Sequence, residues 1–166
     1  MGNLSKLLSQ PEYVHVIINH LPLIGLPVAM LALLIALVAR NRTSVLIGLA
    51  LVGLLSLSAW PVYYYGEAGY DRVLAMADEA GAAFLDCHKD LAEDWVFLYF
   101  VTSGVAGLTF LLSWKWRRLL TPLAILTLVL ASASLVAGIV IAHAGGEIRH
   151  REFRSGSPPP APHTEH

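Results

Sequence analysis

The sequence contains a single cysteine, Cys87, and few charged residues. One cysteine excludes an internal disulfide and the Cys-x-x-Cys-His motif that attaches c-type haem. Charged residues make up 14% of the chain, against about 25% in soluble domains, and 56% of the residues are hydrophobic. No long basic run is present, so nucleic acid is not expected as a partner. These shortages argue against a soluble domain and indicate a protein of the lipid bilayer.

Four apolar stretches are long enough to cross a bilayer, which takes about 20 residues of helix. They are residues 14–39, 45–65, 95–114 and 119–143. Short segments, 40–43 and 115–118, join the first two stretches and the last two. Connections this short make neighbouring helices antiparallel. We therefore predict an all-α, integral membrane four-helix bundle made of two antiparallel hairpins.

The rest of the chain divides into three parts. Residues 1–13 are predicted to be an interfacial segment before a transmembrane domain of residues 14–152, and residues 153–166 a disordered, proline-rich tail. Between the second and third spans, residues 66–94 alternate apolar and charged positions with helical spacing. This pattern predicts an extramembrane amphipathic helix.

Charge sets the predicted orientation. The two short turns hold basic residues and no acid, whereas every Asp and Glu of the chain lies on the opposite side. The positive-inside rule then places the turns in the cytoplasm. We expect a multi-pass protein of the bacterial inner membrane, with both termini and the 66–94 connection in the periplasm.

His20 is the first candidate site residue. It lies inside the first span just before Pro22, where a proline predicts a kink. A histidine within a span is costly unless something binds it, so it marks a candidate functional site. His15 lies five residues earlier, about 140° around a helix, so one face cannot use both rings squarely. We favour His20, which lies deeper, and expect His15 at the headgroups.

Further polar residues are predicted at the same outer end of the bundle. His88 shares the apolar face of residues 66–94 and is therefore expected to point inward. The fourth span ends at His143, followed by a Glu-x-x-His pair with the spacing of a metal-binding motif on a helix. The candidates that meet at this end are His20, Glu67, His88, His143, Glu147, Arg149 and His150.

Three functions fit this group. The first is a b-type haem that carries electrons in a respiratory or photosynthetic chain, with His20 and His88, or His88 and His143, as axial ligands. Arg149 or Arg151 would then pair with the propionates, and Gly25, Gly66, Gly81 and Gly138 would give room. The second is a non-haem iron, copper or zinc site. Its ligands would come from His20, Glu67, His88, His143, Glu147 and His150.

The third function is a scaffold subunit without chemistry, which holds a membrane redox complex together. The polar group would then be a hydrogen-bonded plug at the outer end. In each case the expected partners are the lipid bilayer and other subunits of a redox complex or a periplasmic cytochrome.

Four motifs together resemble a group of small bacterial inner-membrane proteins of four helices and unknown function. The motifs are Asn19-His20-Leu21-Pro22 with Gly25, Gly66-Glu67, His88-Lys89-Asp90, and Gly145-Gly146-Glu147-Ile148-Arg149-His150. The resemblance covers about residues 14–152. Relatives of that group are sometimes fused to Rieske-type iron–sulfur domains, which implies a redox setting. This chain departs from the pattern at Tyr65, where Thr is usual, and at Lys89, where an acid is usual.

Overall fold

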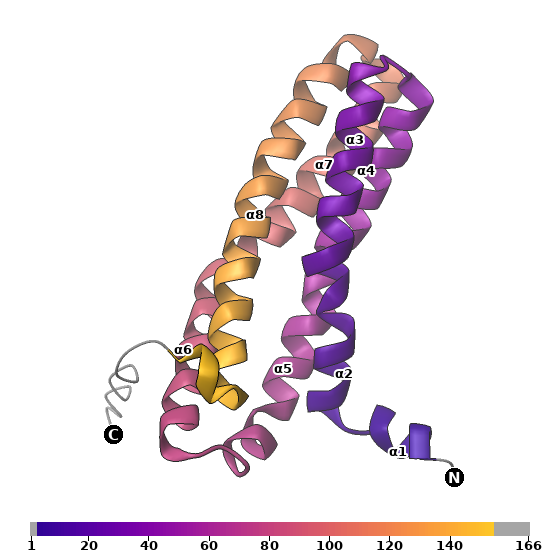
Figure 1. The fold of residues 1–166 in the computed structure, drawn as a ribbon. Helices are drawn as coiled ribbons and strands as arrows, with labels where there is room; N and C mark the ends of the chain where they lie inside the picture. Colours follow the sequence, from indigo (N-terminus) through magenta and orange to yellow (C-terminus); the bar gives the residue numbers. More distant parts are fainter. Residues whose placement is uncertain (1–2, 155–166) are drawn as a thin grey trace.

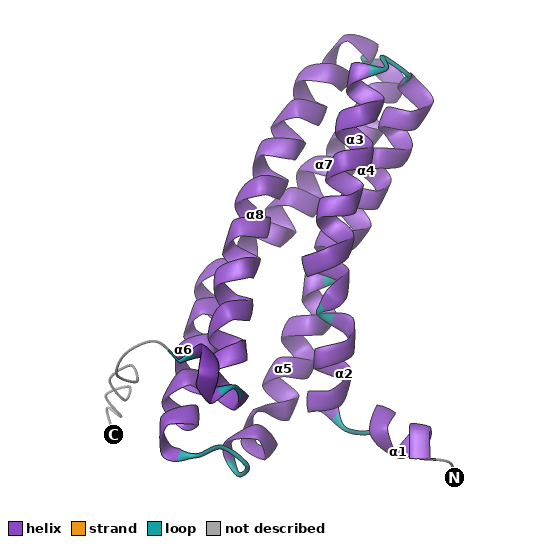
Figure 2. Ribbon diagram, in the orientation of Figure 1, coloured by secondary structure: helices purple, strands orange, loops and turns teal. Residues whose placement is uncertain are grey.

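The structure is a computed structural model that describes residues 3–154. Within that range the chain is helical, with no strand, and its four long helical rods run antiparallel (Figures 1 and 2). All four rods are long and apolar enough to cross a membrane. They span Pro11–Val38, Arg42–Leu74, Glu79–Lys115 and Arg117–Arg149. The all-α four-helix prediction is confirmed.

Short interruptions divide the rods into the helices labelled in Figure 1. In chain order these are α1 (Asn3–Leu8), α2 (Pro11–Ile18), α3 (Leu26–Val38), α4 (Arg42–Leu57), α5 (Ala59–Leu74), α6 (Glu79–Trp95), α7 (Phe97–Lys115) and α8 (Leu120–Arg149). A π-helical turn (Leu21–Gly25) joins α2 to α3. Single 3-10 turns precede and follow α8, at Arg117–Leu119 and Arg151–Phe153. Most of the predicted tail, residues 155–166, lies outside the described residues.

Two of the prolines within the rods, Pro22 and Pro61, lie at interruptions. Pro22 has no N–H to donate to the preceding turn, and at this point the first rod widens into the π-helical turn. Pro61 falls in the first turn of α5, where a helix leaves its N–H groups unbonded in any case. The second rod therefore continues past Pro61 toward the outer end.

The connection between the second and third rods differs from its prediction. Residues 66–94 do not form a separate amphipathic helix, because α5 continues to Leu74 and α6 begins at Glu79. Asp78 caps α6 by accepting a hydrogen bond of 2.8 Å from the Gly81 N–H. At 1.5 Å per residue a rod of 33 residues is about 50 Å long, against about 30 Å of hydrocarbon. The amphipathic segment is therefore the overhang of two spans.

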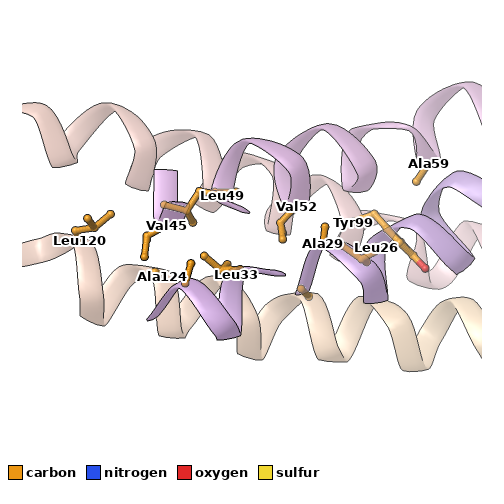
Figure 3. Close-up of a cluster of buried hydrophobic side chains, with 13 residues drawn as sticks. Leu26, Ala29, Leu33, Val45, Leu49, Val52, Ala59, Tyr99, Leu120 and Ala124 are labelled. Carbon is orange, nitrogen blue, oxygen red and sulfur yellow. The ribbon is translucent and has the colours of Figure 1, made fainter. Parts of the chain in front are cut away.

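The tightly packed part of the bundle is at the end that holds the two basic turns. Helices α3, α4, α7 and α8 meet there around a core of small and branched side chains (Figure 3). Gly48 lets α4 approach the backbone of α3, because a Cβ there would lie 2.9 Å from Leu33 Cα. A hydrogen bond of 2.9 Å joins Thr102 of α7 to Ser134 of α8 inside the core. Large apolar side chains such as Val38 and Leu111 cover the outside, as expected of a surface in lipid.

Toward the other end the bundle divides into its two hairpins. Helix α2 packs against α5, and α6 packs against α8, while the two pairs move apart (Figure 1). The pairs meet mainly where α5 faces α6. Here the Tyr70 hydroxyl donates a hydrogen bond to the Asp86 carboxylate. The candidate residues predicted from the sequence all belong to this divided end.

Candidate cofactor site between the two hairpins

A cavity of about 710 Å³ lies between the two hairpins at the divided end. Its walls come from α2, α5, α6 and α8, so both hairpins contribute. The volume falls within the range of about 300–1,000 Å³ that is usual for ligand pockets. We call it the interhairpin cavity.

His15 of α2 is held against α5 on one wall of this cavity. Its Nδ1 lies 2.8 Å from the Val62 carbonyl oxygen. One turn further along α5, Gly66 faces the same ring: a Cβ at that position would lie 3.0 Å from His15 Nδ1. Residues four apart share a helix face, so the carbonyl and the glycine together form a seat for the ring.

His88 of α6 is held in the same way against α8 on the opposite wall. Its Nδ1 lies 2.8 Å from the Ile141 carbonyl oxygen. Gly145, one turn later, packs on the ring, since a Cβ there would lie 3.1 Å from Nδ1 and from Cε1. Each hairpin therefore presents a histidine on its first helix, seated on a carbonyl and a glycine of its second helix. We call the two arrangements the histidine seats.

The hydrogen bonds fix the tautomer of both rings. A carbonyl oxygen only accepts hydrogen bonds, so each Nδ1 carries the proton and donates it. In a neutral imidazole the Nε2 atom then keeps its lone pair. Across the described residues, neither Nε2 has a hydrogen-bond partner. Metal-bound histidines commonly use one nitrogen as ligand and donate the other N–H to a carbonyl, which is the arrangement seen in both seats.

The two rings are close neighbours in the lining of the cavity. Their centroids are 6.2 Å apart and their planes lie at 88°. A metal–imidazole bond is about 2.0–2.1 Å, so two rings on opposite sides of one metal have centroids roughly 6–6.5 Å apart. The separation of His15 and His88 therefore matches two ligands of a single metal.

The structure places His20 elsewhere. Its ring is exposed, and its Nδ1 lies 3.0 Å from the Val16 carbonyl of its own helix. His15 occupies the inward face of α2 instead, and the 140° between the two positions turns His20 away. His88 points inward as predicted, but its partner is His15, which had been expected at the headgroups.

Of the remaining predicted ligands, Glu67 and His150 line the interhairpin cavity together with His88, but they do not form a metal-binding group with it. The His143 side chain is 65% exposed, and its Nε2 lies 3.9 Å from Glu147 Oε1. His150 lies on the cavity rim, where its Nδ1 is 3.0 Å from Glu152 Oε1 and its ring stacks on Phe153. Throughout residues 3–154, no three or more His, Cys, Asp or Glu side chains are grouped so that they could hold a metal ion.

Charged groups line the mouth of the interhairpin cavity. Arg72 pairs with Glu12 at 3.1 Å, and Arg149 donates to the Met76 sulfur at 3.6 Å. Lys89 lies 3.6 Å from Glu93 and 5.2 Å from the centre of the Tyr70 ring. The three cations Arg72, Lys89 and Arg149 therefore come from α5, α6 and α8. The second carboxylate oxygen of Glu12 is buried and has no hydrogen-bond partner among the described residues.

A clamp beyond the cavity joins the α5–α6 connection to the end of α8. Arg154 donates to both Asp78 carboxylate oxygens, at 3.0 and 3.1 Å, and to the Glu147 and Ile148 carbonyls at 2.7 and 2.8 Å. Arg151 lies 2.8 Å from Asp78. The Arg154 hydrogen bonds, with that from the Gly81 N–H, hold the pKa of Asp78 well below its ordinary value.

Comparison with protein-family models, with curated proteins and with solved structures gives no match for this chain. The family resemblance carried by the four motifs stays a prediction. Interpretation of the site therefore depends on its geometry.

Proposed function

We propose that the protein is a membrane electron-transfer protein that binds one b-type haem in the interhairpin cavity, with His15 and His88 as axial ligands. The observation that carries the proposal is the pair of neighbouring imidazoles, with ring centroids 6.2 Å apart and each Nδ1 on a backbone carbonyl. The proposal keeps His88 from the sequence prediction and replaces His20 and His143 with His15.

The number of ligands favours haem over a bare metal ion. Zinc sites use three or four protein ligands, and the described residues offer no such group. Haem needs only the two axial ligands from the protein, because the porphyrin fills the other four positions. The two histidine seats supply that number.

The cavity walls suit an amphipathic cofactor that carries acid groups. Val16, Leu85 and Ala142 give apolar contact within the cavity, and Gly66 and Gly145 remove side chains beside the rings. Arg72, Lys89 and Arg149 would hold the propionates at the mouth, which extends the predicted role of Arg149 to three cations.

Two axial histidines also favour electron transfer over catalysis at the iron. Haem supplies a one-electron couple, and with both axial positions filled by protein no site stays open for a substrate. The seats hold both ligands by backbone groups, so the ligand set does not depend on mobile side chains. This restrains the rings in both oxidation states and limits the rearrangement that accompanies electron transfer.

The positive-inside rule supports an orientation in which the basic turns are cytoplasmic and the cavity is on the periplasmic side of a bacterial inner membrane. Electrons would then pass between haem and a partner on that side, such as a periplasmic cytochrome or another subunit of a redox complex. The test uses protein in sealed vesicles whose orientation is fixed by protease mapping. A membrane-impermeant reductant should reduce the haem only from the side that holds both termini. Reduction only from the side of the basic turns would contradict this placement.

The absorbance spectrum of purified protein tests the proposal most directly. Protein produced with haem available should show a Soret band and, after reduction with dithionite, the sharp bands of six-coordinate low-spin haem. Carbon monoxide should not bind, because both axial positions are filled. His15→Ala and His88→Ala should each lose haem or become able to bind carbon monoxide.

His20→Ala and His143→Ala are the matched controls, because both replace exposed histidines at the same end of the bundle. Both should keep the wild-type spectrum. A colourless wild-type protein, with haem supplied in excess, would refute the proposal. Loss of haem in the His20 variant with retention in the His15 variant would refute the choice of ligands.

A partner-binding role is supported by a separate observation. An apolar groove of about 410 Å³ runs along the lipid-facing side of α4 and α7, where Gly53 and Gly107 leave the backbone exposed. Small residues let membrane helices approach closely, so this groove suits a helix of another subunit. A bulky Gly107→Leu substitution should weaken co-purification of such a subunit and leave the haem spectrum unchanged. Unchanged co-purification would contradict the role.

A further inference from the structure

The two glycines of the histidine seats touch the imidazole rings edge-on. In the seat of α5, a Cβ at Gly66 would lie 3.0 Å from His15 Nδ1 and 3.1 Å from its Cε1. In the seat of α8, a Cβ at Gly145 would lie 3.1 Å from the same two atoms of His88. Such distances are shorter than an ordinary carbon contact, so an alanine would force each ring to shift by a few tenths of an ångström.

Each ring is restrained twice as a result. The hydrogen bond to the carbonyl fixes the direction of the Nδ1–H, and the glycine fixes how closely the ring edge lies against the helix. With both restraints in place the two ring planes are nearly perpendicular, at 88°. The two hairpins therefore set the relative rotation of the rings through backbone groups alone.

We infer that Gly66 and Gly145 are positioning residues, which act through His15 and His88 to hold the two axial imidazoles of a bound haem in perpendicular planes. The inference depends on the proposed function. It adds a property that haem binding alone does not require, because two axial histidines can coordinate iron at any relative rotation.

The orientation has a spectroscopic consequence in the oxidised, low-spin protein. Imidazoles in parallel planes act on the same iron d orbital and separate it in energy from its partner. Perpendicular imidazoles act equally on both orbitals and leave them close in energy. Perpendicular rings therefore give a highly anisotropic electron paramagnetic resonance signal with one dominant low-field feature. Parallel rings give a rhombic signal with three resolved features.

The experiment records this signal from full-length, haem-loaded protein in the oxidised state. We expect the highly anisotropic signal in the wild type, and a shift of its low-field feature in Gly66→Ala and Gly145→Ala. Haem content is measured in the same samples, together with the absorbance spectrum.

Two glycines of the same chain serve as controls. Gly104→Ala adds a methyl group where nothing lies within 4 Å, and Gly146→Ala adds one at ordinary contact, 3.4 Å from Phe153. Both variants should keep the wild-type signal.

Three results would overturn the inference. A rhombic wild-type signal would do so even if neither seat variant folds, and so would an unchanged signal in both folded seat variants. A protein that takes up no haem would overturn the proposed function as well. Haem that binds with parallel rings would overturn only the role of the glycines.

Discussion

Haem should tie the two hairpins together, because each hairpin supplies one axial ligand. At the divided end the hairpins meet mainly through α5 and α6, where Tyr70 donates a hydrogen bond to Asp86. A cofactor that binds only when both seats are in place stabilises the folded chain and not the unfolded one. We therefore expect haem to raise the thermal midpoint of the wild type. His15→Ala and His88→Ala should each abolish most of that rise.

The size of the effect follows from binding linkage. Free haem at 100 times its dissociation constant stabilises the bound state by about 2.7 kcal/mol. For a domain of 150–250 residues, 1 kcal/mol shifts the midpoint by roughly 2–4 °C. This chain has 166 residues. The wild-type midpoint should then rise by about 5–11 °C, by the product of these two figures.

Unfolding is followed in detergent by circular dichroism at several haem concentrations. His20→Ala and His143→Ala serve as controls, and both should keep the full rise because their rings lie outside the site. The variants without haem should unfold close to the wild type without haem. An equal rise in all four variants would mean that haem stabilises the protein without the two seats, and would refute the reasoning.

Three further predictions concern the scaffold around the site. The lowered pKa of Asp78 means that its pairing with Arg154 stabilises the clamp fully above the ordinary carboxyl value of 3.8, and is lost as pH falls further. Hydrogen exchange of residues 147–154 should thus be faster in Asp78→Asn than in the wild type at pH 7 and at pH 5, and the difference should vanish in strong acid. Gly48→Ala should lower the free energy of unfolding in detergent by about 1–3 kcal/mol, because the added Cβ meets the backbone of α3, whereas Gly104→Ala should change it little. Thr102→Val removes one interhelical hydrogen bond and should lower the free energy of unfolding in detergent by about 0.6 kcal/mol. A decrease above about 2 kcal/mol would contradict the expectation that this hydrogen bond contributes little.

The four helices could be predicted from the sequence because hydropathy and the short basic turns determine them directly. Where the helices end could not be predicted, since hydropathy reports only the part of a helix that lies in lipid. Residues 66–94 turn polar at the membrane surface, yet nothing ends α5 there, and the chain stays helical to Leu74. The clearest boundary signal in this region is Asp78, which caps the N-terminus of α6.

The sequence predicted which end of the bundle holds the candidate residues, but not which of the histidines lie together. The inward direction of His88 followed from its place among apolar residues of an amphipathic segment. The first span is apolar on most faces, so the residue pattern does not predict which side of this helix faces inward. The inward side decides between His15 and His20. The carbonyls of Val62 and Ile141 carry no side-chain signal, but the glycines four residues after each of them do. Gly66 and Gly145, each one helical turn after the carbonyl that a histidine contacts, were the sequence feature that could have indicated the pairing.

The depth of the site explains why two polar seats are tolerated in an apolar bundle. At 1.5 Å per residue, Val62 lies about 30 Å along its rod from Arg42, and His88 about 40 Å from Lys115. In the predicted orientation, with the basic turns at one membrane surface, a hydrocarbon layer of about 30 Å would end near Val62 and short of His88. The imidazoles and the cations at the cavity mouth would then lie where headgroups and water begin, and where a buried polar group costs less than at the bilayer centre. The closely packed end contains a hydrogen-bonded Thr102–Ser134 pair and no charged group in its core. Among the described residues, the helices between this level and the basic turns offer no second haem site. A haem held at this level would therefore exchange electrons with a partner at the same surface.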